Sequence, residues 1–241
     1  MRIYSNCLEM VKEEERNLME LGIEVKPYSY QDKIVEGNPD FYTKELRGAV
    51  FTITNGQDDK DQLLEFFGIS KLWAAQEFKE RIDFLASHNP GYAWEYRREV
   101  WEEFLHNGKF EYSYSERMFP QLKKVLDELI RRPNTRQAII DIHNGKQDVD
   151  NLGGQGRVPC SLNYGMYIRN KELELFYTMR STDFYTHFGS DIWQALSLQQ
   201  FAVNYYNKFM AEHEKIICGN FTFFSMSLHA FYKDLKSRSI F

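Results

Sequence analysis

The stretch Arg157–Gln194, RVPCSLNYGMYIRNKELELFYTMRSTDFYTHFGSDIWQ, decides how the rest of the chain is interpreted. Cys160 directly follows a proline, two strand-like runs within 163–179 predict a hairpin, and the cluster Arg180-Ser181-Thr182-Asp183 leads to Asp191. Read as chemistry, these are a thiol nucleophile, an arginine–serine pair able to bind an anion, and a carboxylate able to read the edge of a ring. Each has an ordinary structural explanation alone, since a lone cysteine is usually a buried thiol. The combination in one stretch indicates a site.

The rest of the chain predicts an α+β domain with one mixed sheet and helices packed on it. Strand patterns occur at 49–54, 137–142 and 221–227, and helix patterns at 59–67, at 70–87, through 122–130 and from Asp191 onward. They do not alternate regularly as parallel α/β folds require. No linker or repeat divides the sequence, so residues 1–241 are interpreted as a single domain.

The predicted helix 70–87 has an apolar stripe, Ala75, Phe78, Ile82 and Leu85, which predicts its buried face. Glu80 lies off that stripe, so from periodicity alone it is an exposed carboxylate. The charged run 12–16, KEEER, similarly indicates a solvated helix face.

Composition restricts the classes of partner. A chain of 241 residues with 43% hydrophobic residues is globular, and a net charge of −5 argues against binding a nucleic-acid polymer. A small anionic ligand held by a few arginines stays compatible with that charge. Three cysteines are too few for a disulfide framework or a zinc site, so no metal is expected and a reducing cytoplasm is the expected compartment. No signal peptide and no membrane-spanning run is recognisable.

The order of Pro159-Cys160, Arg180-Ser181, Asp183 and Asp191 resembles the thymidylate synthase superfamily, over about residues 44–235. Within it, Met179 before the Arg-Ser pair and the aspartate at 191 are similar to the branch of bacteriophage deoxycytidylate hydroxymethylases. Residues 1–40 match poorly and are interpreted as an N-terminal extension. The resemblance implies a thymidylate synthase-like domain, a homodimer formed through the sheet, and 5,10-methylenetetrahydrofolate as cofactor. If the protein is phage-encoded, the compartment is the host cytoplasm.

The resemblance also implies a mechanism and catalytic residues. The thiolate of Cys160 adds to C6 of a pyrimidine, which makes C5 a nucleophile toward the one-carbon unit. Tyr114 matches a tyrosine near this thiol, and Asp183 is assigned to catalysis and to folate binding. Trp101 is expected to stack on the folate or pyrimidine side. Glu80 is preferred as the proton relay over Glu65, whose distance to Trp101 along the chain is too long.

Nucleotide recognition is implied at both ends of the substrate. Arg180 and Ser181 would bind the phosphate together with Arg136 from the partner subunit. The family usually has a second arginine after that position, and here it is Gln137, with Lys44 or Arg47 as candidates to compensate. His229 would hold the sugar 3′-hydroxyl. Its usual tyrosine partner is here Phe231, which leaves CMP open as an alternative to dCMP.

Asp191 stands where a thymidylate synthase has asparagine. An amide can accept from uracil N3–H and donate to O4, whereas cytosine offers a donor at N4 and an acceptor at N3. A carboxyl group that shares a proton with N3 matches cytosine. The alternative is a helix N-cap, because Asp191 is predicted to begin a helix.

The resemblance thus implies an enzyme that converts dCMP, methylenetetrahydrofolate and water to 5-hydroxymethyl-dCMP and tetrahydrofolate. The alternatives are a C5-methylating enzyme acting on dUMP or dCMP, a CMP hydroxymethylase, and a catalytically silent nucleotide-binding member. Met179 favours water over hydride as the second reactant, because synthases commonly have glutamine there.

Overall fold

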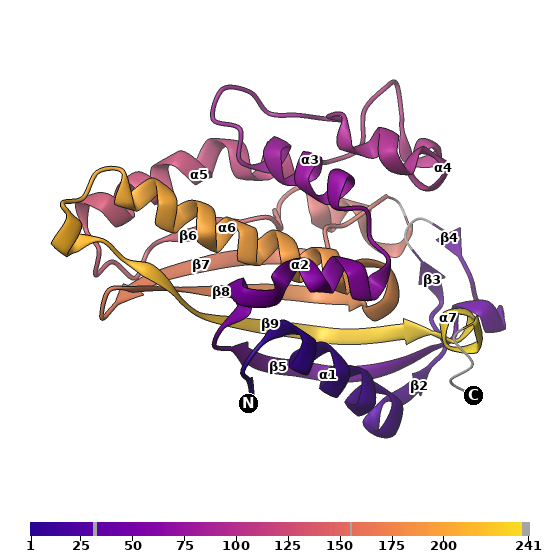
Figure 1. Cartoon of the computed structure of the whole chain (residues 1–241). Coiled ribbons are helices and arrows are strands. Elements are labelled where there is room, and N and C mark those ends of the chain that lie inside the picture. Colours follow the sequence, from indigo (N-terminus) through magenta and orange to yellow (C-terminus); the bar gives the residue numbers. More distant parts are fainter. Residues whose placement is uncertain (31–32, 155, 238–241) are drawn as a thin grey trace.

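The computed structural model describes residues 1–30, 33–154 and 156–237, and its centre is a seven-stranded mixed sheet (Figure 1). The strand order is β1-β5-β9-β8-β7-β6. The strand β2 pairs with the first residues of β5, and β1 pairs with the last residues of β5. The strands are β1 (Arg2–Tyr4), β2 (Ile23–Val25), β5 (Thr43–Ile53), β6 (Ile139–Asp141), β7 (Ser161–Arg169), β8 (Glu172–Asp183) and β9 (Ile217–Phe231). β1 is parallel to β5 and β8 is parallel to β9, whereas the other pairs are antiparallel. A separate small hairpin joins β3 (Ser29–Tyr30) and β4 (Lys33–Ile34).

The predicted hairpin is confirmed as β7 and β8. Asn170 and Lys171 form its turn with φ of 51° and 62°, the left-handed values that tight hairpin turns require. The backbone N–H of Arg180 donates to Cys160 O at 2.8 Å, so the hairpin holds these two residues side by side. On its other edge β8 pairs with β9, where Asp183 lies opposite His229. One strand therefore connects three predicted site positions.

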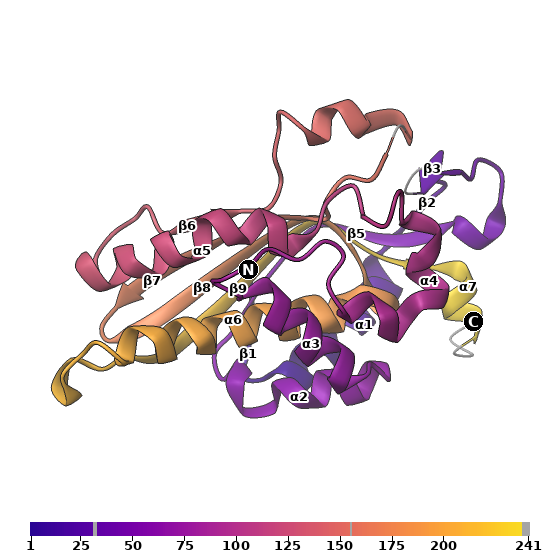
Figure 2. The same ribbon diagram turned by 90° about the horizontal axis from the view of Figure 1, so that it is seen from above.

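Helices cover one face of the sheet, as the side view and the view from above show (Figures 1 and 2). They are α2 (Gly56–Phe67), α3 (Lys71–Arg81), α5 (Tyr114–Arg131) and α6 (Gly189–Asn207), and α1 (Cys7–Leu21) packs against α2 and β5. Shorter helices are α4 (Arg98–Trp101) and α7 (Tyr232–Ser237). None of the helices in the described ranges is long and apolar enough to cross a membrane.

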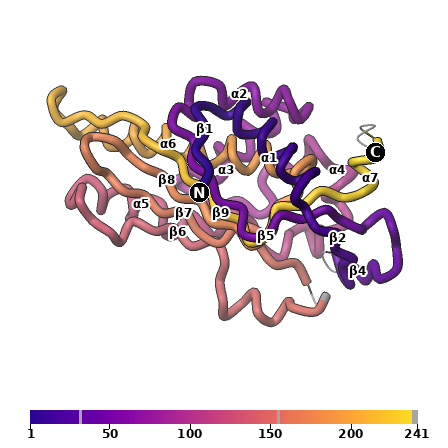
Figure 3. The backbone as a smooth tube through the Cα atoms, turned by 90° about the horizontal axis from the view of Figure 1, so that it is seen from below, coloured from indigo at the N-terminus to yellow at the C-terminus, as the bar shows by residue number. Residues whose placement is uncertain are grey.

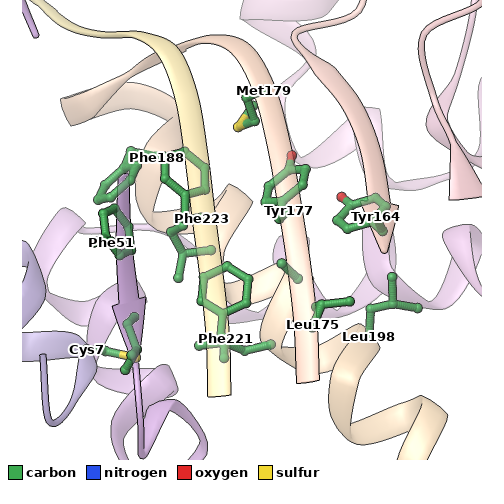
Figure 4. Close-up of a cluster of buried hydrophobic side chains, with 14 of the residues drawn as sticks. Cys7, Phe51, Tyr164, Leu175, Tyr177, Met179, Phe188, Leu198, Phe221 and Phe223 are labelled. Atoms are coloured by element: carbon green, nitrogen blue, oxygen red, sulfur yellow. The ribbon is translucent and has the colours of Figure 1, made fainter. Parts of the chain in front are cut away.

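The core lies between this helix layer and the sheet and is rich in aromatic rings (Figure 4). Tyr164 and Tyr177 on adjacent strands stack with their centroids 4.4 Å apart, and Phe51 stacks on Phe223 at 5.0 Å. Seen from below, the central strands run side by side and the segment Asp148–Gly154 stands away from the body of the molecule (Figure 3).

The prediction for helix 70–87 is right at its start, wrong at its end and only partly right in its buried face, where Phe78 and Ile82 pack against the core but Ala75 and Leu85 are exposed. Ser70 caps α3, with its side chain accepting from Trp73 N, but the helix ends at Arg81 and Leu85 is 93% exposed. The buried residues of α3 are Trp73, Ala74, Glu80 and Arg81. Periodicity of apolar residues failed here because the inward face carries charged side chains.

The N-terminal segment is part of the structure rather than an appendage. β1 adds to the main sheet, and Glu14 is fully buried, accepting from Tyr4 Oη at 2.6 Å and pairing with Arg2 at 2.9 Å. The charged run 12–16 is therefore only partly solvated.

The close approach of α6 to α2 gives a test of this packing. A Cβ at Gly189 would overlap the ring of Phe67, whereas one at Gly145 would meet no atom within 4 Å. We expect Gly189→Ala to lower the free energy of unfolding by about 1–3 kcal/mol, the usual cost of overpacking, in urea denaturation. Gly145→Ala is the matched control, and equal effects of the two substitutions would contradict the packing described here.

Candidate functional site

A cavity of about 590 Å³ lies where the ends of β8 and β9 meet the helix layer, within the usual size of small-molecule sites. Its wall contains nearly all of the residues that the sequence predicted, namely Cys160, Glu80, Tyr114, Asp183, Arg180, Ser181, Asp191, His229 and Trp101. Arg136 is the exception. Within the described residues, no group of three or more His, Cys, Asp or Glu side chains is placed to hold a metal ion.

Arg180 is held beside the thiol by backbone carbonyl groups. Its Nε donates to Pro159 O and its Nη2 to Val158 O, both at 2.9 Å, and Nη1 donates to Ser181 Oγ at 3.2 Å. Ser181 Oγ lies 3.8 Å from Cys160 Sγ, and the thiol is half-buried. A fixed guanidinium and a hydroxyl group next to an accessible thiol can bind an anion.

Asp183 and Asp191 have different local roles. Asp183 caps the π-helical turn Phe184–Phe188, accepting from Tyr185 N at 3.1 Å and Thr186 N at 3.4 Å. Asp191 is not a helix cap, because α6 begins at Gly189 with Phe188 in the cap position. Thr182 Oγ1 donates to Asp191 Oδ2 at 3.0 Å. Burial raises the pKa of Asp191 to about 7 against the opposing effects of Arg81 and this hydrogen bond, so the group can carry or release a proton near neutral pH.

Glu80 is buried, contrary to the reading from periodicity. Its Oε1 accepts hydrogen bonds from Tyr92 N at 2.6 Å, Gln76 Nε2 at 2.8 Å and Ala93 N at 2.9 Å. Gly91 is needed at this point because a Cβ there would overlap the Glu80 carboxylate. One oxygen thus anchors the loop after α3, and Oε2 accepts no hydrogen bond from the described residues.

Tyr114 and Trp101 both line the cavity, and each has a stacked arginine. The Tyr114 hydroxyl lies 3.5 Å from Ser161 N, next to the thiol residue, and burial raises the pKa of this phenol well above its ordinary value. Arg81 lies over the Tyr114 ring with Cζ 4.4 Å from its centroid. Arg157 covers Trp101 at 4.7 Å, so a stacked ligand would need the other face of that indole.

The sugar end predicted for His229 includes an unexpected contribution from the N-terminal segment. His229 Nδ1 is 3.3 Å from Ser227 Oγ, and burial lowers the pKa of His229, which favours the neutral imidazole. Phe231 contacts both His229 and Tyr30 edge to face, with centroids 5.4 Å apart in each pair. Tyr30 therefore brings a phenol to the wall where Phe231 has none.

The cations predicted for the phosphate do not all meet in this cavity. Arg136 is exposed between α5 and β6, Lys44 Nζ donates to Met19 O, and Arg47 is exposed on β5. None of the three lines the cavity.

Sequence reasoning missed Glu77 and Arg81, which share the cavity wall one helical turn apart and form an ion pair. A signal existed, because Trp73, Glu77, Glu80 and Arg81 lie on one helical face. It was hidden because charged residues at helical spacing usually indicate a solvated surface.

The raised pKa of Asp191 predicts a pH-dependent stability. Between about pH 4 and 7 the folded state keeps a proton that the unfolded state loses, so stability falls as pH rises through this window. Asp191→Asn removes the effect, and we expect it to raise the free energy of unfolding, measured by urea denaturation, by up to about 4 kcal/mol at pH 8 but hardly at pH 4. Asp150→Asn, at an exposed carboxylate, is the control. A stabilisation of equal size at both pH values would contradict the assignment.

Comparisons with known proteins agree on one family. The family model described as thymidylate synthase matches residues 42–237. A putative thymidylate synthase of Methanocaldococcus jannaschii is 24% identical over 200 residues, covering 83% of this chain and 80% of that protein. Among solved structures, the thermostable thymidylate synthase A from Bacillus subtilis superposes with a TM-score of 0.63 at 15% identity, over 96% of this chain and 82% of that one. The T4 phage thymidylate synthase gives 0.58 at 16% identity, over 95% and 78%. The chain has the thymidylate synthase-like fold, and it belongs to the thymidylate synthase family.

Proposed function

We propose that this member of the thymidylate synthase family hydroxymethylates C5 of dCMP. Folate-dependent one-carbon transfer to a pyrimidine nucleotide is the family's chemistry. The observation that carries the finer proposal is Asp191, a carboxyl group with a pKa near 7 in the wall that also holds Cys160 and Arg180. Residues 1–241 would act as one catalytic domain, since the sheet takes strands from both ends of the described chain.

Cys160 would act as the nucleophile. Its thiolate adds to C6 of the ring, the electron pair moves to C5, and C5 becomes able to form a carbon–carbon bond. Arg180 and Ser181 hold the phosphate. The Arg180 guanidinium is also the cation that lies next to the thiolate. Glu80 Oε2 and the Tyr114 hydroxyl would move protons, among them the one that C5 loses, and water would be the final reactant at the new carbon. Breaking the bond between Cys160 Sγ and C6 would then free the product and the thiolate.

Base choice would rest on Asp191. A carboxyl group accepts from the N4 amino group of cytosine, and a proton shared with N3 completes the match. Uracil reverses both positions, so an aspartate selects against it. The helix-cap alternative loses its basis because Phe188, not Asp191, occupies the cap position.

A C5-methylating enzyme is the second candidate, because the residue expected to favour water over hydride lies away from the cavity. Met179 is fully buried in the core (Figure 4) and does not line the cavity, so it gives no geometric reason to prefer water over hydride. The relatives named above are thymidylate synthases. Cytosine recognition through Asp191 and the choice of second reactant are therefore separate questions.

The cavity has features that fit methylenetetrahydrofolate as well as a nucleotide. It extends from Cys160 to an aromatic side containing Trp101, Phe110 and Tyr112. Trp101 and Asp183 would hold the folate, which when bound supplies the one-carbon unit. Tyr30 next to Phe231 would supply sugar contacts for dCMP, and CMP remains the alternative substrate.

A homodimer formed through the sheet would complete the phosphate site with Arg136. Supporting this, the sheet face opposite the helices carries half-exposed Tyr167, Phe176 and Phe224 and exposed Met226. Apolar residues on an open sheet face are typical of a subunit interface. Arg136 lies outside its own cavity and is exposed, as a contribution to a partner requires.

Product analysis tests the function directly. The protein is incubated with methylenetetrahydrofolate and, separately, dCMP, CMP and dUMP, and products are identified by mass spectrometry. We expect hydroxymethyl-dCMP from the wild type, none from Cys160→Ala, and a shift of preference toward dUMP in Asp191→Asn. A methylated product would favour the second candidate. Wild-type turnover of dUMP alone would reject the role of Asp191, and no product from any nucleotide would favour a silent member.

Mixing two inactive variants tests the shared phosphate site. Cys160→Ala lacks the thiol and Arg136→Ala lacks the donated arginine, so a mixed dimer contains one site with neither defect. We expect activity to reappear after the two variants are unfolded and refolded together, but not after either is refolded alone. No recovery, with mixed dimers shown to form, would contradict the role given to Arg136.

A further inference from the structure

Arg81 is a buried cation of the cavity wall for which the mechanism above has no use. It is the last residue of α3 and is 6% exposed, and its guanidinium lies over the ring of Tyr114. Burial opposes its charge, but the Glu77 carboxylate and neighbouring tyrosines keep the pKa of Arg81 above its ordinary value. Arg81 is therefore a permanent cation in the wall of the cavity.

The hydrogen bonds of Arg81 are incomplete. Nη2 donates to Glu77 Oε1, whereas Nε and Nη1 are buried and find no hydrogen-bond partner among the residues that the structure describes. Of the described residues that hold a buried side-chain atom without a partner, Arg81 alone lines the cavity. By contrast, each of the three nitrogens of Arg180 donates to an acceptor of the protein. Buried donors without a partner are destabilising, which suggests that a ligand supplies the acceptor.

The surroundings of Arg81 place it at the base end of the cavity. The Tyr114 hydroxyl beneath it reaches Ser161 N, next to Cys160. Its charge also acts on Asp191, where it is the main influence that opposes the effect of burial on the carboxyl pKa. A ring attached through C6 to Cys160, with its edge toward Asp191, would thus approach Arg81.

Cytosine needs a donor next to the acceptor that Asp191 provides. A carboxylate takes the N4 amino group, and N3 then requires an N–H or O–H. A proton on Asp191 satisfies N3 only below its pKa, whereas a guanidinium donates at every physiological pH. Arg81 lines the same wall and has two spare donors, which matches this requirement.

Resting on the proposed function, we propose that Arg81 is a substrate-binding residue that donates a hydrogen bond to N3 of the bound cytosine while Asp191 accepts one from its amino group. In this arrangement the Arg81 donor takes the place of the proton shared between Asp191 and N3, so Asp191 acts as a carboxylate and the two side chains together recognise the N4–N3 edge of cytosine.

Nucleotide binding without folate tests this contact. The probes are dCMP, dUMP, 3-deaza-dCMP, which has C–H in place of N3, and deoxyribose 5-phosphate, which has no base. Affinities are measured by calorimetry at pH 8, where a carboxyl group with a pKa of about 7 is mostly ionised. The variants are Arg81→Met and Arg81→Lys. Arg97→Met is the matched control, since Arg97 stacks on Trp73 at 4.7 Å but does not line the cavity.

We expect the wild type and Arg97→Met to bind dCMP about 10- to 100-fold more tightly than 3-deaza-dCMP, the usual effect of one hydrogen bond to a charged group. Arg81→Met should lose this difference and Arg81→Lys most of it, with deoxyribose 5-phosphate affinity unchanged in all proteins. Full discrimination in both Arg81 variants would overturn the proposal.

If an Arg81 variant misfolds and no longer binds deoxyribose 5-phosphate, the wild-type affinities alone still test the Arg81 contact. Equal wild-type affinity for dCMP and 3-deaza-dCMP would overturn the Arg81 contact and leave the proposed function standing. A wild type that binds dUMP and not dCMP would instead reject the proposed function.

Discussion

The pairing of β8 on both of its edges is the constraint on which the site depends. The antiparallel neighbour β7 pairs with β8 from Glu172 to Met179, and the parallel neighbour β9 pairs with it as far as Asp183, so the two together fix the register of the strand. Because side chains alternate along a strand, Leu173, Leu175, Tyr177 and Met179 are buried in the core, and the residues after them reach the cavity. A slip of one residue would exchange Met179 and Arg180 and remove the site.

Charge in the cavity is arranged differently from charge on the surface. The chain is acidic overall, yet the cavity wall holds Arg81, Arg157 and Arg180, each covered by an aromatic ring or held by backbone carbonyl groups. Cations in this setting are dehydrated and fixed in orientation, which strengthens their interaction with an anion or a ring acceptor. A protein with a net negative charge can therefore bind an anionic ligand through a few arginines that are fixed in its cavity.

Much of the fold and of the site could be predicted from sequence, because the informative residues lie on strands with strong local patterns. The β7–β8 hairpin followed from its turn and its alternation, and the residues around Cys160 and Arg180 came with it. Glu80, Glu77 and Arg81 were harder, since a helical face of charged residues has the same pattern whether it meets water or a cavity. Asp191 was placed in the right helix but at the wrong position in it, because the π-helical turn before it has no sequence signature that periodicity detects.

The N-terminal segment has a consequence for how relatives are compared. The family model begins at residue 42, yet Val25, Pro27, Ser29 and Tyr30 form part of the cavity wall. Proteins that share every catalytic residue can thus differ in what they accept through a segment that family-wide alignments leave out. Substrate range in this group would then change through substitutions in the N-terminal part of the cavity wall, whereas the residues around the thiol stay the same.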